Sequence, residues 1–184
     1  MDPITRRATI TRQPFTVASV GGVLRCPCHA STTQAAASTL SYWCYLGYRP
    51  RGEVIRYVRV GVSSGGSGAQ TAEVAIATSP GPPAFSTTVL TKVWADGTLD
   101  ALTSSGIKGN TTANTIPLAA DSHVWAGFRS AMASTQPTLH ILQRDWGMGF
   151  LSYLYTTALT GSTTWTVTNL DFASNTHPDV RGYL

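Results

Sequence analysis

The stretch from Glu53 to Thr78 limits the possible folds more than any other part of the chain. Its first half, EVIRYVRVGV, places Val58, Val60 and Val62 at alternate positions, and its second half, AEVAIAT, alternates aliphatic residues with small ones. Alternation with a period of two is the pattern of a β-strand with one buried face. The linker SSGGSGAQ does not favour a helix, so we expect the two halves to form a long antiparallel hairpin.

Similar patterns recur along most of the chain. No stretch has the 3.6-residue periodicity of an amphipathic helix. About nine short strands bounded by turn residues predict an all-β protein, namely a β-sandwich of jelly-roll or Greek-key type. The predicted strands lie at 15–24, 39–48, 53–62, 72–78, 87–95, 123–129, 138–144, 150–156 and 165–172.

The chain is expected to consist of two parts. Residues 1–38 are predicted to form an extended N-terminal arm and a loop, because ITRRATITR has too few apolar residues for a core strand and residues 26–38 are mostly small and polar. Residues 39–184 are predicted to form the β-sandwich domain. Within it, we expect residues 98–113 to be mostly loop and the tail from Ser174 to be irregular.

Charge is scarce and unevenly distributed. Charged residues make up 12% of the 184 residues, against roughly 25% in an average globular domain. The first 60 residues contain eight arginines and only two acidic residues. We therefore expect the arm, with Arg6, Arg7 and Arg12, to bind an acidic surface. An acidic protein is the expected partner, and nucleic acid is less favoured because Thr and Ile interrupt the basic residues.

The motifs that would indicate an enzyme are incomplete. Residues 61–65, GVSSG, match the G-x-S-x-G pattern of a nucleophile elbow, but that motif needs a helix after the serine and GGSGAQ does not start one. His123, His140 and Asp145 have no spacing that suggests acid–base catalysis. We expect no catalytic residues.

Neither a metal site nor a cofactor site is predicted. Cys26, Cys28 and His29 resemble half of a zinc site, with Cys44 as a possible third thiolate, but C-x-C spacing is unusual for zinc and no second pair follows. Three cysteines without regular spacing do not indicate a disulfide framework. Asn110 begins an N-x-T sequon, which we expect to be an ordinary polar loop.

The five tryptophans are expected to pack in the core or at interfaces. Trp146 is the candidate for a different role, because it stands among glycines in the sequence DWGMG, where an aromatic ring can be exposed. We interpret it as a possible platform on which a sugar ring could stack.

Three phrases of the sequence resemble small jelly-roll virion proteins of tailed bacteriophages: GAQTAEVAIATSP, LTKVWADGTLDALTSSGIKGNTT and HVWAGFRSAMASTQPTL. Such proteins decorate capsids or form pieces of tail tips and fibres. The resemblance spans residues 40–142 and consists of strand and turn phrases, without a catalytic signature. It implies a β-sandwich, a structural role and self-association, often as a trimer.

These observations lead to one expected function and two alternatives. The expected function is that of a capsid decoration (cement) protein, a homo-oligomer and by expectation a trimer, which binds the major capsid protein or another virion protein and stabilises the head shell. One alternative is a tail or fibre protein whose loops at 63–70, 103–113 and 145–149 bind a host-surface glycan. The other is a viral coat protein whose arm contacts nucleic acid.

The expected location is the virion, after synthesis in the host cytoplasm. The sequence MDPITRRATITRQ has no apolar segment of the kind found in secretory signals. No apolar run approaches the roughly 18 residues of a transmembrane helix, so no membrane association is expected.

Overall fold

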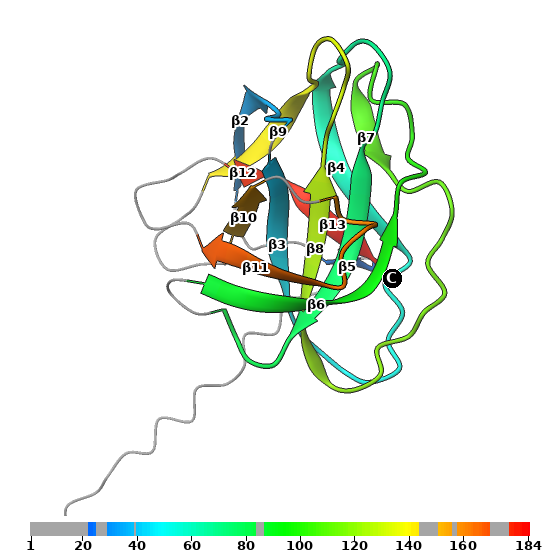
Figure 1. Cartoon of the computed structure of the whole chain (residues 1–184), viewed down its shortest axis with the longest axis vertical. Helices are drawn as coiled ribbons and strands as arrows, with labels where there is room; N and C mark the ends of the chain where they lie inside the picture. The colour runs from blue at the N-terminus through cyan, green and yellow to red at the C-terminus, as the bar shows by residue number, and fades with distance from the viewer. Residues whose placement is uncertain are drawn as a thin grey trace, which may run out of the picture.

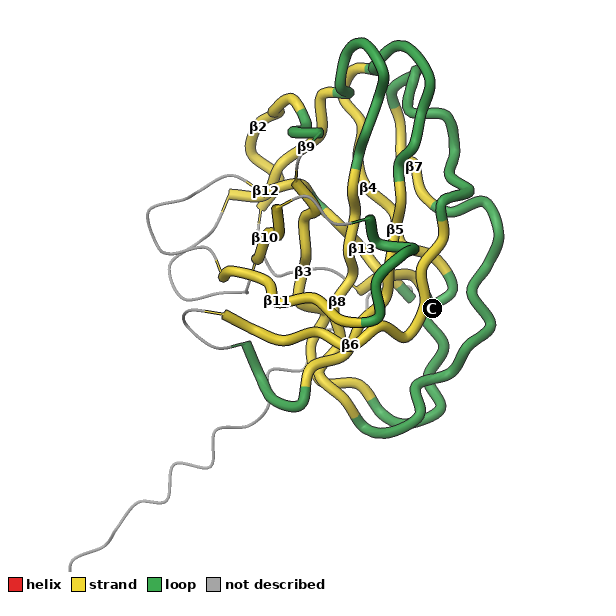
Figure 2. The backbone as a smooth tube through the Cα atoms, in the orientation of Figure 1, coloured by secondary structure: helices red, strands yellow, loops and turns green. Residues whose placement is uncertain are grey.

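A computed structural model describes residues 22–24, 29–38, 40–83, 87–143, 151–155, 158–169 and 177–184. In this part of the chain every regular element is a β-strand (Figure 1; Figure 2). The strands form two curled antiparallel sheets that pack as a sandwich, which confirms the predicted all-β sandwich. Among the described residues there is no helix long and apolar enough to cross a membrane.

Sheet A has seven strands. They are β1 (Val23–Leu24), β2 (His29–Ala35), β4 (Tyr57–Ser64), β7 (Gly106–Gly109), β9 (Thr138–Gln143), β12 (His177–Pro178) and β13 (Val180–Tyr183). Their order is β1-β13-β4-β9-β12, with β7 paired to β4 and β2 paired to β9. The strand β4 therefore contacts β13, β7 and β9, and it organises the sheet.

Sheet B closes on itself in the order β10-β11-β6-β5-β8-β3. Its strands are β3 (Leu40–Arg49), β5 (Glu73–Ser79), β6 (Thr87–Asp96), β8 (Ser122–Arg129), β10 (Leu151–Tyr155) and β11 (Thr164–Asn169). The strands β3, β5 and β8 are buried along most of their length. They are covered on both faces, which explains why their sequences are apolar or small at both parities.

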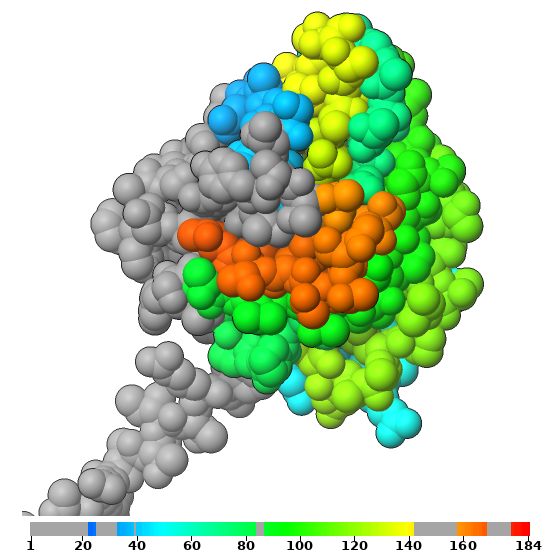
Figure 3. Space-filling view, viewed as in Figure 1, coloured from blue at the N-terminus to red at the C-terminus, as the bar shows by residue number. Residues whose placement is uncertain are grey.

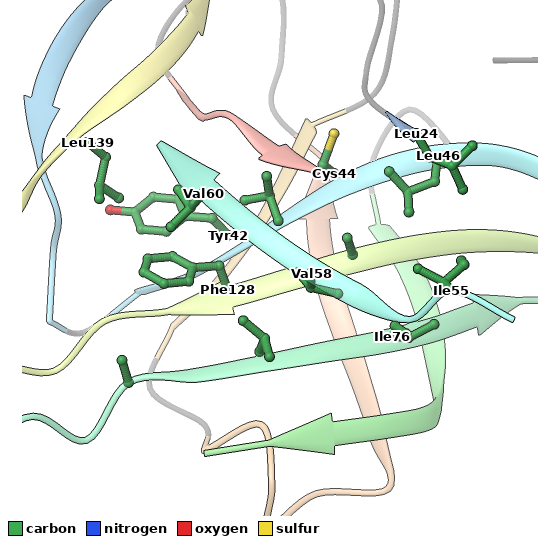
Figure 4. Close-up of a cluster of buried hydrophobic side chains, with 14 of the residues drawn as sticks. Leu24, Tyr42, Cys44, Leu46, Ile55, Val58, Val60, Ile76, Phe128 and Leu139 are labelled. Carbon is green, nitrogen blue, oxygen red and sulfur yellow. The ribbon is translucent and has the colours of Figure 1, made fainter. Parts of the chain in front are cut away.

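Alternate side chains of these strands point to opposite faces of sheet B and enter two different hydrophobic clusters. One lies between the sheets, where Val58 and Val60 of β4 meet Tyr42, Ile76 and Phe128 of sheet B (Figure 4). The other cluster is formed mainly by the side chains of sheet B that point to its opposite face. Its members are Trp43, Tyr45, Ala75, Ala77, Leu90, Trp125, Leu159, Trp165 and Val167.

Gly127 makes the second cluster possible. It stands directly opposite Trp43 in the β3–β8 ladder. A Cβ atom at Gly127 would lie 2.8 Å from two atoms of the Trp43 ring. Trp43 in turn packs against Trp165, with ring centroids 4.9 Å apart. The glycine therefore provides the space that the Trp43 ring occupies.

The predicted hairpin at Glu53–Thr78 is wrong. The strand β4 lies in sheet A and β5 lies in sheet B, so the Gly-rich linker crosses between the sheets. A Cβ atom at Gly65 would lie 2.1 Å from the Thr103 carbonyl oxygen, and one at Gly66 would lie 2.4 Å from the Thr135 carbonyl oxygen. The glycines permit close backbone packing, a use of glycine that sequence alone does not distinguish from a flexible turn.

Three segments predicted as loop or irregular contain strands. Residues 29–35 form β2, which pairs with β9 from His29↔Gln143 to Ala35↔Thr138. Residues 106–109 form β7, and the predicted irregular tail contains β12 and β13. These strands are short or have exposed polar residues, so their apolar alternation is weak. Parts of residues 1–38 thus belong to the sandwich, whereas the arm at residues 1–21 lies outside the described residues.

We expect Gly127→Ala to lower the free energy of unfolding by about 1–3 kcal/mol, because the added methyl group overpacks against the Trp43 ring. Urea denaturation provides the measurement. Gly81→Ala is the matched control, since a Cβ atom at Gly81 meets no atom within 4 Å. Equal stabilities of the two variants would show that Trp43 does not fill the space above Gly127.

Candidate functional site

The outer face of sheet A carries a pair of arginines. In β4, Val58, Val60 and Val62 point into the core, so Tyr57, Arg59 and Gly61 belong to the opposite, outer parity. Across the ladder to β13, Arg59 stands directly opposite Arg181 and Tyr57 stands directly opposite Tyr183. Like charges in directly opposed positions repel, so this row needs compensating negative charge.

Asp179 compensates one of the two charges. Its side chain is 1% exposed, and Oδ2 accepts hydrogen bonds from both Nε and Nη2 of Arg181. The Nε–Oδ2 distance is 2.7 Å. The hydrogen bond to Asp179 raises the pKa of Arg181 above its ordinary value. Arg181 is therefore a fixed cation whose charge is already paired.

Arg59 is held by aromatic rings. Its Cζ atom lies 4.9 Å from the ring centroid of Tyr57 and 5.5 Å from that of Tyr183, which are cation–π distances. Its Nε atom is buried and has no hydrogen-bond acceptor. None of the ion pairs found among the described residues involves Arg59. The second positive charge of the row is thus positioned but not neutralised.

A cavity of about 250 Å³ opens beside these arginines. It is lined by Arg59, Val60, Gly61, Ile107, His140 and Arg181. The arrangement places two guanidinium groups and an imidazole around one hollow.

The outer face of β6 and β11 is uncharged. Val89 is 53% exposed, and all of its neighbours of the same parity are exposed threonines. The cross-strand pairs are Thr87↔Thr168, Val89↔Thr166 and Thr91↔Thr164. All six residues are exposed. We call this set the threonine face; β11 and β6 lie side by side on the front of the molecule (Figure 3).

A tyrosine–histidine pair lies between strands β3 and β8. The Tyr45 hydroxyl lies 2.6 Å from Nδ1 of His123. Burial raises the pKa of Tyr45 to about 12, so the hydroxyl keeps its proton at neutral pH. Burial lowers the pKa of His123, so the imidazole is neutral under the same conditions. The neutral Nδ1 can then accept the hydrogen bond from the tyrosine.

Glu73 secures the turn that precedes β11. One carboxylate oxygen accepts a hydrogen bond from the Leu159 amide at 2.7 Å, and the other accepts one from the Thr160 hydroxyl. Arg129 lies 3.5 Å away as its ion-pair partner. The carboxylate is therefore used to hold the chain in place at the end of the threonine face.

The sequence-predicted site residues fall into two groups. Arg6, Arg7, Arg12 and Trp146 lie outside the described residues, so their proposed binding roles stay predictions. Cys26 and Cys28 also lie outside the described residues, whereas Cys44, Asn110, His123 and His140 can be placed. Among the described residues no metal-binding cluster of His, Cys, Asp and Glu occurs, and the Cys44 thiol is buried and free.

Asn110 of the sequon has a structural role, and the two histidines lie in different sheets. Asn110 is buried and its side chain binds the Val58 amide at 2.8 Å, so it is a structural residue of the loop that follows β7. His140 lines the sheet A cavity, whereas His123 lies in sheet B. Asp145 lies outside the described residues.

The tryptophans follow the prediction of core packing wherever the structure describes them. Trp43, Trp125 and Trp165 are buried in the second cluster. Trp94 is partly buried against the first cluster.

Sequence reasoning missed Arg181, Tyr183 and Asp179, because the tail was predicted to be irregular. A signal was present. In VRGY, the buried Val180 and Gly182 alternate with Arg181 and Tyr183, which is the period of a strand. Four residues are too few for that alternation to stand out from chance.

Comparison of the chain with protein-family models, with curated proteins and with solved structures found no match.

We expect His123 to make folding stability depend on pH. Its pKa in the folded protein is below the ordinary value of about 6.5, so the unfolded chain binds the proton more readily. The stabilisation is complete above about pH 6.5 and declines as the pH falls through that value toward the folded pKa. His123→Gln should therefore lose less unfolding free energy than the wild type between about pH 7 and pH 5.

Urea denaturation at the two pH values measures this difference, and the other histidines cancel because both proteins contain them. An equal loss in both proteins would contradict a depressed pKa at His123.

Proposed function

We propose that this chain is a structural protein of a bacteriophage virion, a non-catalytic capsid decoration (cement) protein that stabilises the head shell. The resemblance of residues 40–142 to jelly-roll virion proteins motivates the class of protein. The observation that carries the proposal is the threonine face on β6 and β11. It is the kind of surface that suits packing against a neighbouring subunit.

The threonine face has chemistry suited to a permanent contact. Five of its six members are threonine and one is valine, so docking removes no charge from water. β-branched side chains are stiff about χ1, and their ordering costs little conformational entropy. An uncharged face can also meet the same face of another copy without like-charge repulsion. We therefore assign it to contacts within a homo-oligomer, for which a trimer is the expected state.

Several charges of the chain are already satisfied within it, which is compatible with close packing against a neighbour. Three acidic residues of the described chain are tied to arginines of the same chain, in the pairs Arg49–Glu53, Arg129–Glu73 and Arg181–Asp179. Charges that are satisfied internally do not repel a neighbour at close range. The arm, with Arg6, Arg7 and Arg12, would then supply the positive charge that binds an acidic surface of the major capsid protein.

The mechanism would be mechanical. Interfaces between permanent partners commonly bury more than roughly 2,000 Å². Contacts among copies and with the shell would add interface area across the joints between capsid subunits. That area would oppose the outward pressure of packaged DNA.

A tail or fibre protein that binds a host glycan is the second candidate. One observation favours it: two of the three loops predicted for that role, 63–70 and 103–113, lie against each other where Gly65 meets the Thr103 carbonyl, whereas loop 145–149 lies outside the described residues. The Gly66 amide binds the Leu102 carbonyl at 2.9 Å, and the Gln70 side chain accepts a hydrogen bond from the Leu102 amide at 2.7 Å. Such a joined loop cluster is a preorganised surface. Saturable binding of the purified protein to host cells would favour this candidate over decoration.

We expect lysines on the threonine face to abolish decoration. Particles that lack the chain would be reconstituted with wild-type protein or with Val89→Lys/Thr166→Lys, two changes at one cross-strand pair. Packing two unpaired charges against a neighbour is costly, so the variant should fail to associate and the particles should stay heat-sensitive. The measurements are retained copies per particle and survival after heating.

Thr115→Lys is the control, since Thr115 is exposed but lies outside the threonine face. It should restore heat resistance like the wild type. Full heat resistance of particles that lack the protein would contradict the cement function. Full activity of the double-lysine variant would contradict the role of the threonine face while leaving the function in place.

A further inference from the structure

We propose that the cavity on the outer face of sheet A is an anion-binding site that takes the carboxylate or phosphate group of a small ligand. The proposal does not rest on the virion function, because the cavity and the threonine face lie on different sheets. Its support comes from four features of the cavity: its charge, an unpartnered donor, its glycines and its size.

The charge of the cavity is incompletely balanced. Arg59 and Arg181 occupy directly opposed positions in the ladder. Asp179 binds Arg181 through two hydrogen bonds to one oxygen, which accounts for one positive charge. A bound anion beside Arg59 would neutralise the other charge and remove the repulsion between the opposed guanidinium groups.

Arg59 is also preorganised for such a ligand. The rings of Tyr57 and Tyr183, at 4.9 and 5.5 Å, restrict the guanidinium to one region of the surface. Its buried Nε–H has no acceptor, although buried donors are almost always satisfied. Turning this Nε–H toward the cavity would let it and an Nη group bind one oxyanion together. Arginine binds carboxylates and phosphates through this two-point fork.

Gly61 forms part of the cavity wall, and Gly109 packs against Arg59 beside it. Gly61 lines the cavity, and a Cβ atom there would lie 3.0 Å from Cδ2 of His140. Gly109, opposite Arg59 in β7, has no room for a side chain, since a Cβ atom would lie 2.7 Å from Cγ of Arg59. Glycine inside a strand often marks a place where a ligand or another backbone approaches closely. Here it lets the arginine stem and the imidazole lie flat around the hollow.

The size and walls of the cavity define the class of ligand. Pockets for drug-sized molecules are commonly about 300–1,000 Å³, and this cavity of about 250 Å³ lies just below that range. It suits an anionic group carried on a short organic body. Ile107, which is 55% exposed, supplies an apolar wall, and His140 supplies a further donor.

The test is an NMR titration of the full chain with two probes, inorganic phosphate and acetate, at constant ionic strength set with sodium chloride. We expect saturable shifts of the Arg59 Nε–H and His140 ring signals with at least one probe. A response to phosphate alone assigns a phosphate ligand, and a response to acetate alone assigns a carboxylate ligand. A response to both assigns a general oxyanion site.

Variants separate the site from general charge effects. Arg59→Gln should weaken binding about tenfold or more, because a charge-assisted hydrogen-bond pair is lost. Arg59→Lys keeps the charge but loses the planar fork, so intermediate binding is expected. Arg56→Gln is the matched control, since Arg56 is exposed and does not line the cavity. No saturable shift with either probe, or equal weakening by the Arg56 and Arg59 variants, would overturn the proposal.

Discussion

Burial of both faces of β3, β5 and β8 is the constraint on which the structure depends. Sheet B closes on itself and also packs against sheet A, so these strands contribute side chains to two clusters. Burial of apolar surface contributes about 25 cal/mol per Å², and a strand covered on both faces contributes at every residue. Gly127 shows how tightly the side chains must fit, because a Cβ atom there would lie 2.8 Å from the Trp43 ring. The outward-facing side chains of β4, β13, β6 and β11 are not needed for this core, so they can take part in binding.

The outer surfaces of the two sheets differ in charge and shape. On sheet A, alternation in β4 and β13 places two arginines and two tyrosines on the outer face, and the two arginines line a cavity. On sheet B, alternation in β6 and β11 exposes threonine and valine without a charge. A polar, preorganised hollow suits a small anion, whereas an uncharged β-branched surface suits a neighbouring subunit. We therefore propose different roles for the two faces of one sandwich.

The sequence was sufficient for the fold class, because alternation in segments such as Tyr57–Ser64 is strong. The sequence does not determine which strands pair, because alternation with a period of two is the same whichever strand is the neighbour. The alternation on both sides of the Gly-rich linker therefore predicts a hairpin turn, whereas the linker crosses between the sheets. The Arg59–Arg181 pair joins residues over 100 positions apart through strand register, which the sequence does not contain. Arg56 has the same parity as Val58, Val60 and Val62, but it is exposed because it lies just before β4 begins.

The assignment of the sandwich to a capsid surface can be tested by a density map of the intact particle at a resolution that separates strands. We expect copies of the chain on the outside of the head shell, in contact with one another through β6 and β11. Copies confined to the tail, or copies on the head with the threonine face exposed to solvent, would contradict it.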